Sequence, residues 1–212
     1  MTVRRSKVLT RVLVAAAALG IIGFLFVRSL EDTRSQPYTV ARASTDTWVL
    51  VVRSSASANS PMLSLRTRPE LVANLSRQVF QRVMESNASP QEALIPLLLQ
   101  DEFDRALAGK MTPDALVAAA RAAGLESARH ELRCLAHRRE SEGRRVRQVY
   151  FVIVDSPSVR AFREQLARTV APDFDASALT PVVVVAHSES SFEHWLPIRA
   201  NEEECVAPIR VE

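Results

Sequence analysis

Residues 127–154 read SARHELRCLAHRRESEGRRVRQVYFVIV, and their pattern is the most informative for the fold. In its first part, apolar and charged side chains alternate, as they do in a strand with one buried face. The polar run RRESEGRR follows, in which Gly143 can adopt a positive φ, and residues 149–154 then form a continuous apolar strand. We therefore predict a β-hairpin over residues 127–154. A helix with Leu125, Ala128, Leu132 and Leu135 on one face is the alternative for the first part.

The chain after this hairpin is expected to continue the sheet. Asp155-Ser156-Pro157 begins a predicted helix over residues 157–170, because proline is favoured at the first helical position. Residues 182–186 are a second apolar strand. The order strand, helix, strand predicts a right-handed crossover between parallel neighbours. Two later segments, residues 192–198 and 205–211, are predicted edge strands.

The chain before the hairpin contains strands and then helices. Residues 48–52 and 62–66 are predicted strands. Thr67 and Glu70 have the spacing of a capping box that begins a first helix. Ser89-Pro90 is expected to begin a second helix that runs to about Ala108 with a kink at Pro96, and a third is expected over residues 112–124. These elements predict an α+β domain with a mixed β-sheet and helices mainly on one face.

An uncharged apolar segment near the N-terminus predicts a membrane anchor. The sixteen residues Val12–Val27 span about 24 Å as a helix, and basic residues precede them. The positive-inside rule then places the N-terminus in the cytoplasm and the rest outside. We expect a cytoplasmic tail over 1–7, a transmembrane signal anchor over 8–28, a linker over 29–46 and an exported domain over 47–212. A cleaved signal peptide and a secreted domain are the alternative.

The charge distribution disfavours a nucleic-acid partner. The formal net charge is +3, but five of the 27 basic residues flank the apolar segment, and the other 22 are outnumbered by 24 acidic residues. A nucleic-acid partner would require a basic domain. Outside the apolar segment the only glycines are Gly109, Gly124 and Gly143, so no phosphate-binding loop can form. We therefore expect neither a nucleotide partner nor a cofactor.

Three polar residues suggest a catalytic site. Asp155 and His187 each follow an apolar strand, and Ser188 comes next to His187. If the two strands are parallel neighbours, both residues lie at the carboxyl edge of the sheet, where open α/β sheets bind ligands. A general base or a Ser-His-Asp arrangement would then be available. The alternative is that Asp155 or Ser156 caps the helix and His187 begins a loop.

The two cysteines predict a disulfide. Cys134 and Cys205 both lie in the part expected outside the cytoplasm, where cysteines tend to pair. The bond would join the central hairpin to the C-terminal segment. A metal site with His130, Cys134 and His137 would require a helix over these residues, because His137 faces the other side of a strand. The strand prediction therefore argues against a metal.

The turn of the hairpin carries a basic cluster, namely Arg138, Arg139, Arg144 and Arg145. A solvated turn explains it, and a contact with anionic lipid, a wall polymer or an acidic protein is the functional alternative. The leading hypothesis is a single-pass protein of the bacterial envelope whose exported domain binds another envelope protein or a wall component. The alternative hypothesis is an exported hydrolase that uses Asp155 and His187.

Overall fold

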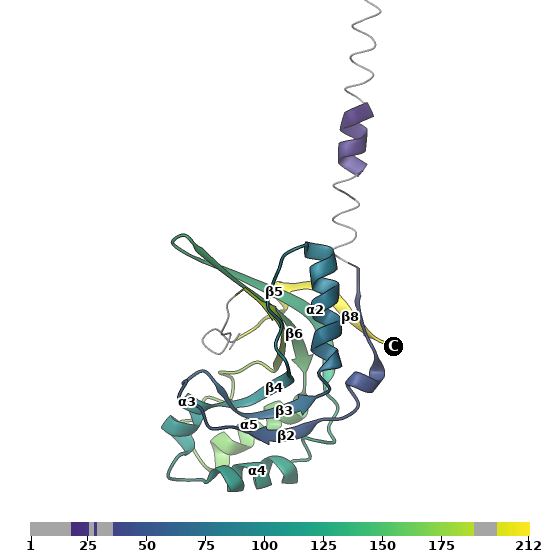
Figure 1. Cartoon of the computed structure of the whole chain (residues 1–212). Coiled ribbons are helices and arrows are strands. Elements are labelled where there is room, and N and C mark those ends of the chain that lie inside the picture. Colours follow the sequence, from purple (N-terminus) through teal and green to yellow (C-terminus); the bar gives the residue numbers. More distant parts are fainter. Residues whose placement is uncertain (1–17, 26–27, 29–35, 189–198) are drawn as a thin grey trace, which may run out of the picture. The chain divides into compact units, whose positions relative to one another are not determined.

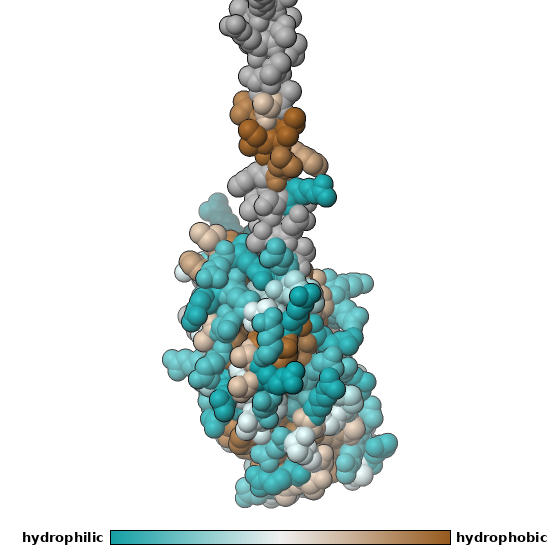
Figure 2. Space-filling view, turned by 90° about the vertical axis from the view of Figure 1, so that its right-hand side faces the viewer, coloured by the Kyte–Doolittle hydropathy of each residue, from teal (hydrophilic) through white to brown (hydrophobic). Residues whose placement is uncertain are grey.

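A computed structural model describes residues 18–25, 28, 36–188 and 199–212, and the chain divides into two units, Met1–Gln36 and Pro37–Glu212. In the first unit, residues 18–25 are helical and their large apolar side chains, such as Leu19 and Phe24, are exposed. Figure 2 shows this segment as strongly hydrophobic. No helix within the described residues is both long and apolar enough to cross a membrane. Most of the anchor expected over 8–28 lies outside those residues.

Two sheets organise the second unit, and its described part contains eight strands. The larger sheet has the order β1 (Tyr38–Val40), β8 (Cys205–Val211), β5 (Glu131–Glu142), β6 (Arg145–Asp155) and β7 (Val182–His187). β1 and β8 are parallel, and the other neighbours are antiparallel. The smaller sheet is antiparallel, with the order β2 (Val49–Val52), β3 (Pro61–Thr67) and β4 (Ala93–Leu99). The predicted α+β class with a mixed sheet is confirmed.

Three longer helices pack against the sheets, and Figure 1 shows α4 and α5 at the end of the unit opposite the turn between β5 and β6. They are α2 (Glu70–Val83), α4 (Pro113–Ala122) and α5 (Pro157–Thr169). Shorter helical turns are η1 (Arg42–Ser44), α3 (Gln100–Glu102), η2 (Phe103–Leu107) and η4 (Glu202–Glu204). Buried residues of all three longer helices share one apolar core with both sheets. A second buried cluster, on the opposite face of the larger sheet, contains Cys134, Ala136, Phe151 and Val184.

The helix expected from Ser89 to Ala108 is wrong in its first half. Residues 93–99 form β4, and Pro96 lies opposite Ser64 of β3. β4 is an edge strand of its sheet, so a proline without an N–H group is tolerated there. Thr67 is not the cap of α2 either, because it ends β3 and its hydroxyl donates to the carbonyl oxygens of Ser44 and Thr47.

The parallel crossover is also wrong. The β6 and β7 strands are antiparallel, because the chain between α5 and β7 returns to the end of the sheet where β6 finished, and the Val154 N–H donates to the carbonyl of Pro181. The hairpin over 127–154 and the helix over 157–170 are confirmed. β1 falls within the segment expected to be a linker, and the edge strand expected over 192–198 lies outside the described residues.

Candidate functional site

The proposed catalytic residues lie at opposite ends of one strand pair. Val149 of β6 is opposite His187, and Ile153 is opposite Val182. Asp155 is the last residue of β6, so it lies about 20 Å along the strand from the position opposite His187. The structure therefore does not bring Asp155 and His187 together, and the hydrolase hypothesis loses the geometry on which it depended.

His187 and Ser188 have structural contacts of their own. His187 is buried, and its backbone exchanges two hydrogen bonds with Ala88 in the segment between α2 and β4. Ser188 donates its N–H to the carbonyl of Gln148, and its hydroxyl accepts from the N–H of Gln148 at 2.9 Å. These bonds continue the contact with β6 one residue beyond the end of β7.

A cavity of about 490 Å³ opens beside Asp155, at the other end of the pair. Its charged walls are neutralised by ion pairs: Arg160 lies 3.5 Å from Asp155, and Arg133 lies 3.6 Å from Glu202. Arg163 also reaches the cavity, from α5. The cavity thus offers few charges that are not already compensated by the protein.

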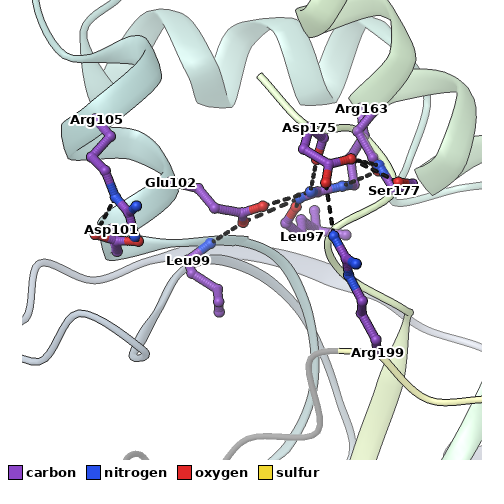
Figure 3. A network of polar contacts seen from close by, with 10 residues as sticks. Leu97, Leu99, Asp101, Glu102, Arg105, Arg163, Asp175, Ser177 and Arg199 are labelled. Carbon is purple, nitrogen blue, oxygen red and sulfur yellow. Dashed lines mark hydrogen bonds and ion pairs between the residues drawn. The ribbon is translucent and has the colours of Figure 1, made fainter. Parts of the chain in front are cut away.

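Arg163 is a structural residue, although it lines the cavity. Its side chain is 1% exposed, and Figure 3 shows it at the centre of a polar network. Nη2 donates to Oε1 of Glu102 at 2.6 Å and to the carbonyl of Asp175, and Nη1 donates to Oε2 of Glu102 and the carbonyl of Leu97. Nε donates to the carbonyl of Ala176. All five guanidinium N–H groups are therefore used within the protein.

His130 and Ser156 form a buried pair that the sequence did not indicate. The histidine Nε2 lies 2.9 Å from the carbonyl of Leu125, which only accepts, so Nε2 carries the proton and Nδ1 accepts from the Ser156 hydroxyl at 2.8 Å. Burial lowers the pKa of His130 and favours this neutral form. Ser156 Oγ also accepts from the N–H of Val159 and so caps α5. The serine thus caps α5, and although it lines the cavity, its hydroxyl is bonded within the protein.

Cys134 and Cys205 form a disulfide with a Cα–Cα distance of 5.7 Å, as predicted. Cys134 is consequently not available to a metal, and both ring nitrogens of His130 have protein partners. His137, the third residue of the metal hypothesis, stacks on Tyr150 with ring centroids 4.3 Å apart. The described residues contain no group of three or more His, Cys, Asp or Glu side chains that could hold a metal.

The hairpin extends beyond the rest of the sheet as a two-stranded arm. β8 pairs with β5 only as far as Ala136, and β7 pairs with β6 only from Val149. Residues 138–148, which we call the arm, have no other paired strand within the described chain (Figure 1). The turn has Gly143 at a φ of +60°, between Glu142 and Arg145 as the last cross-strand pair.

The arginines of the predicted cluster do not form one group. The Arg138 side chain is only 22% exposed, and its Nε lies 2.5 Å from Oε1 of Glu204. Burial alone would raise the pKa of Glu204, but the bonds from Arg138 and from the Asn201 N–H together lower it. Arg139 and Arg144 are exposed on the arm, and the side chain of Arg145 is outside the described part of the structure. Arg138 therefore belongs to the base of the arm, and Arg139 and Arg144 to its exposed part.

The base of the arm is fixed from several directions. Gln148 Nε2 donates to Oε2 of Glu85 at 2.5 Å and to Oδ1 of Asn87, both in the segment that follows α2. The disulfide joins β5 to β8 just before the arm begins. Burial lowers the pKa of His137, which also lies at the base. These contacts join residues distant in sequence, so no local pattern could have indicated them.

A second surface feature is a shallow groove of about 680 Å³ between α2 and residues 86–91. Phe80 lines it, and Met84, at the end of α2, is 75% exposed with a φ of +58°. A left-handed conformation is unfavourable for methionine, and it turns the chain at the end of the helix toward the base of the arm.

Comparison with protein-family models, with curated proteins and with solved structures found no match to this chain.

Proposed function

We propose that this protein is a single-pass, membrane-anchored protein of the bacterial envelope whose exported domain acts by binding and not by catalysis. The main support for this proposal is the arm, which extends beyond the rest of the sheet without a further paired strand in the described chain. An isolated two-stranded ribbon is only marginally stable in water, and unpaired strand edges invite contacts with other molecules. A protruding arm with a fixed base is therefore better suited to contact than to chemistry.

The charge of the arm specifies the kind of partner. Its residues 139–147 contain four arginines and two glutamates. Exposed arginines recognise phosphate and carboxylate groups. The proposed partner is therefore an anionic component of the envelope. The disulfide supports export of the domain, because such bonds form and persist in oxidising compartments.

Site-specific photocrosslinking in cells that produce the full chain tests the binding role. A photoreactive residue replaces Ser141 on the arm, and the matched control replaces the exposed Ala118 on α4, at the opposite end of the domain (Figure 1). We expect a defined adduct from position 141 and none from position 118. Equal labelling at the two positions would contradict an arm-mediated contact.

A fusion of alkaline phosphatase to the C-terminus tests the topology. The enzyme requires an oxidising compartment, so we expect an active fusion that sediments with membranes. An inactive fusion would overturn the proposed orientation. Activity confined to the soluble fraction would show that the N-terminal segment is cleaved.

A further inference from the structure

Three segments meet at one end of the domain. Arg82, in the last turn of α2, donates to the carbonyl of Pro37, where the domain begins, and its guanidinium lies 3.8 Å from the ring centroid of Tyr38. Glu85, just past the same helix end, accepts from Gln148 at the base of the arm. The beginning of the domain, the C-terminal end of α2 and the arm are thus joined. Figure 1 shows the arm reaching toward this end, with its turn level with the end of α2.

This end combines apolar and basic side chains. Met84 is 75% exposed, and Val146 on the arm is 44% exposed. Arg139 and Arg144 are exposed on the same arm. Arginines beside protruding apolar residues are typical of surfaces that rest in the headgroup region of a bilayer, where the cation meets phosphate and the apolar group enters the acyl boundary.

The length of the linker limits where this end can lie. The inference rests on the proposed anchor over residues 8–28. Residues 29–36 then reach at most about 28 Å when fully extended. Pro37 is held within that distance of the bilayer, and the helix end and the base of the arm are joined to Pro37 by the contacts described above.

A second copy of the chain fits the arm poorly. In antiparallel self-pairing of β5 about a twofold axis, residues of one face lie opposite each other. An axis at residue 139 places Arg139 opposite Arg139, and one at 140 places Glu140 opposite Glu140. In both arrangements the two side chains on the axis carry like charges, which disfavours self-pairing.

We infer that the end of the domain formed by Pro37, Met84 and the arm rests on the outer surface of the membrane, and that the arm recognises the phosphates of anionic lipid headgroups. The arm then orients the domain on the bilayer and directs the opposite end, with α4 and α5, away from it.

Full-length protein in lipid nanodiscs provides the test. An environment-sensitive fluorophore is attached to Ser141→Cys on the arm, or to Ala118→Cys on α4 as the control, with the disulfide kept oxidised. The discs contain phosphatidylcholine alone or with one third phosphatidylglycerol, and nitroxide-labelled lipid serves as quencher. We expect severalfold stronger quenching at position 141 than at 118 in anionic discs. This difference should fall in neutral discs and in 0.5 M salt, where the Debye length is about 4 Å.

Two triple variants separate local from general charge effects. Arg139→Ser with Arg144→Ser and Arg145→Ser should reduce quenching at position 141 to the level at 118. The control, Arg121→Ser with Arg129→Ser and Arg168→Ser, removes the same charge elsewhere on the surface and should leave it unchanged. Equal effects of the two variants would overturn recognition by the arm.

The remaining outcomes separate this inference from the proposed function. Stable incorporation into discs without preferential quenching at position 141 would retain the anchor and overturn the lipid contact. Failure to incorporate would overturn the anchor and, with it, the inference. Crosslinking of position 141 to a protein in native membranes, without quenching in discs, would replace the lipid by a protein partner.

Discussion

Arg163 and Glu102 are 61 positions apart in the sequence, and they form an ion pair with 2.6 Å between Nη2 and Oε1. The pair joins α5 to the helical turn that follows β4. Its carboxylate also accepts the N–H of Leu99, so one buried contact fixes the end of a strand and the position of a helix.

Removing the arginine should therefore destabilise the domain strongly. We expect Arg163→Met to lower the free energy of unfolding by about 3–5 kcal/mol, because it leaves the Glu102 carboxylate without its partner. Urea denaturation measures the change. Arg160→Met, an exposed site on the same helix, should change it by less than about 0.5 kcal/mol. Adding Glu102→Gln to Arg163→Met should lose less than the sum of the two single changes, and strict additivity would show that the pair is not coupled.

Replacing both cysteines by serine should also destabilise the domain. The disulfide closes a loop with a sequence separation of 71, which the chain-entropy model values at about 4 kcal/mol. Denaturant unfolding of the double variant Cys134→Ser, Cys205→Ser measures the loss in the free energy of unfolding. Alkylation of unreduced, unfolded wild-type protein should add no alkyl group to its mass. Two added groups would rule the bond out.

Stability should fall as the pH drops from about 7 to 5. Burial lowers the pKa of His130 in the folded state, so the unfolded chain binds the proton first, near its ordinary pKa of about 6.5. The stabilisation that neutral His130 contributes is fully present at pH values above this ordinary pKa and decreases at lower pH. The free energy of unfolding, measured across this pH range, should change less steeply with pH in His130→Gln than in the wild type. Part of the slope should remain, because burial also lowers the pKa of His137. An unchanged slope would mean that His130 is not a source of the pH dependence.

The arginines of the arm should differ in their effect on stability. Arg138→Ser removes an ion pair with Glu204 and a hydrogen bond to the carbonyl of Arg199, at a site that is mostly buried, so we expect a loss on the order of 1–2 kcal/mol. Arg139→Ser and Arg144→Ser change exposed charges and should alter the melting temperature very little. Similar losses for all three would show that the exposed part of the arm is packed against another segment.

Local patterns predicted the elements better than their arrangement. The alternation in the segment identified β5, although a bulge between Leu132 and Cys134 places these two side chains in different buried clusters. Thr112 before Pro113 identified the start of α4, where the Thr112 hydroxyl accepts from the N–H of Ala115. Such signals depend on neighbours in the sequence. The segment 93–99 was misassigned because a short, fully apolar run has no periodicity to distinguish a buried strand from a helix.

The candidate site was less predictable because strand direction is not encoded locally. The sequence showed that Asp155 and His187 each follow an apolar strand, but the loop after α5 decides whether those strands are parallel. The arm could be recognised as a basic turn. The pairing of Arg138 with Glu204 and of Gln148 with Glu85 could not, because both depend on how distant segments pack.

The parallel pairing of β1 with β8 has a consequence for biosynthesis. Tyr38 lies opposite Ile209, and within the described chain β8 is the only strand that β1 joins. During synthesis from the N-terminus, β1 is made first, and nearly the whole domain must therefore be synthesised before β8 can pair with it. Contacts of such large sequence separation slow folding. Until β8 has been synthesised, β1 has no strand to pair with. This edge of the sheet is therefore completed only after the domain has been translated.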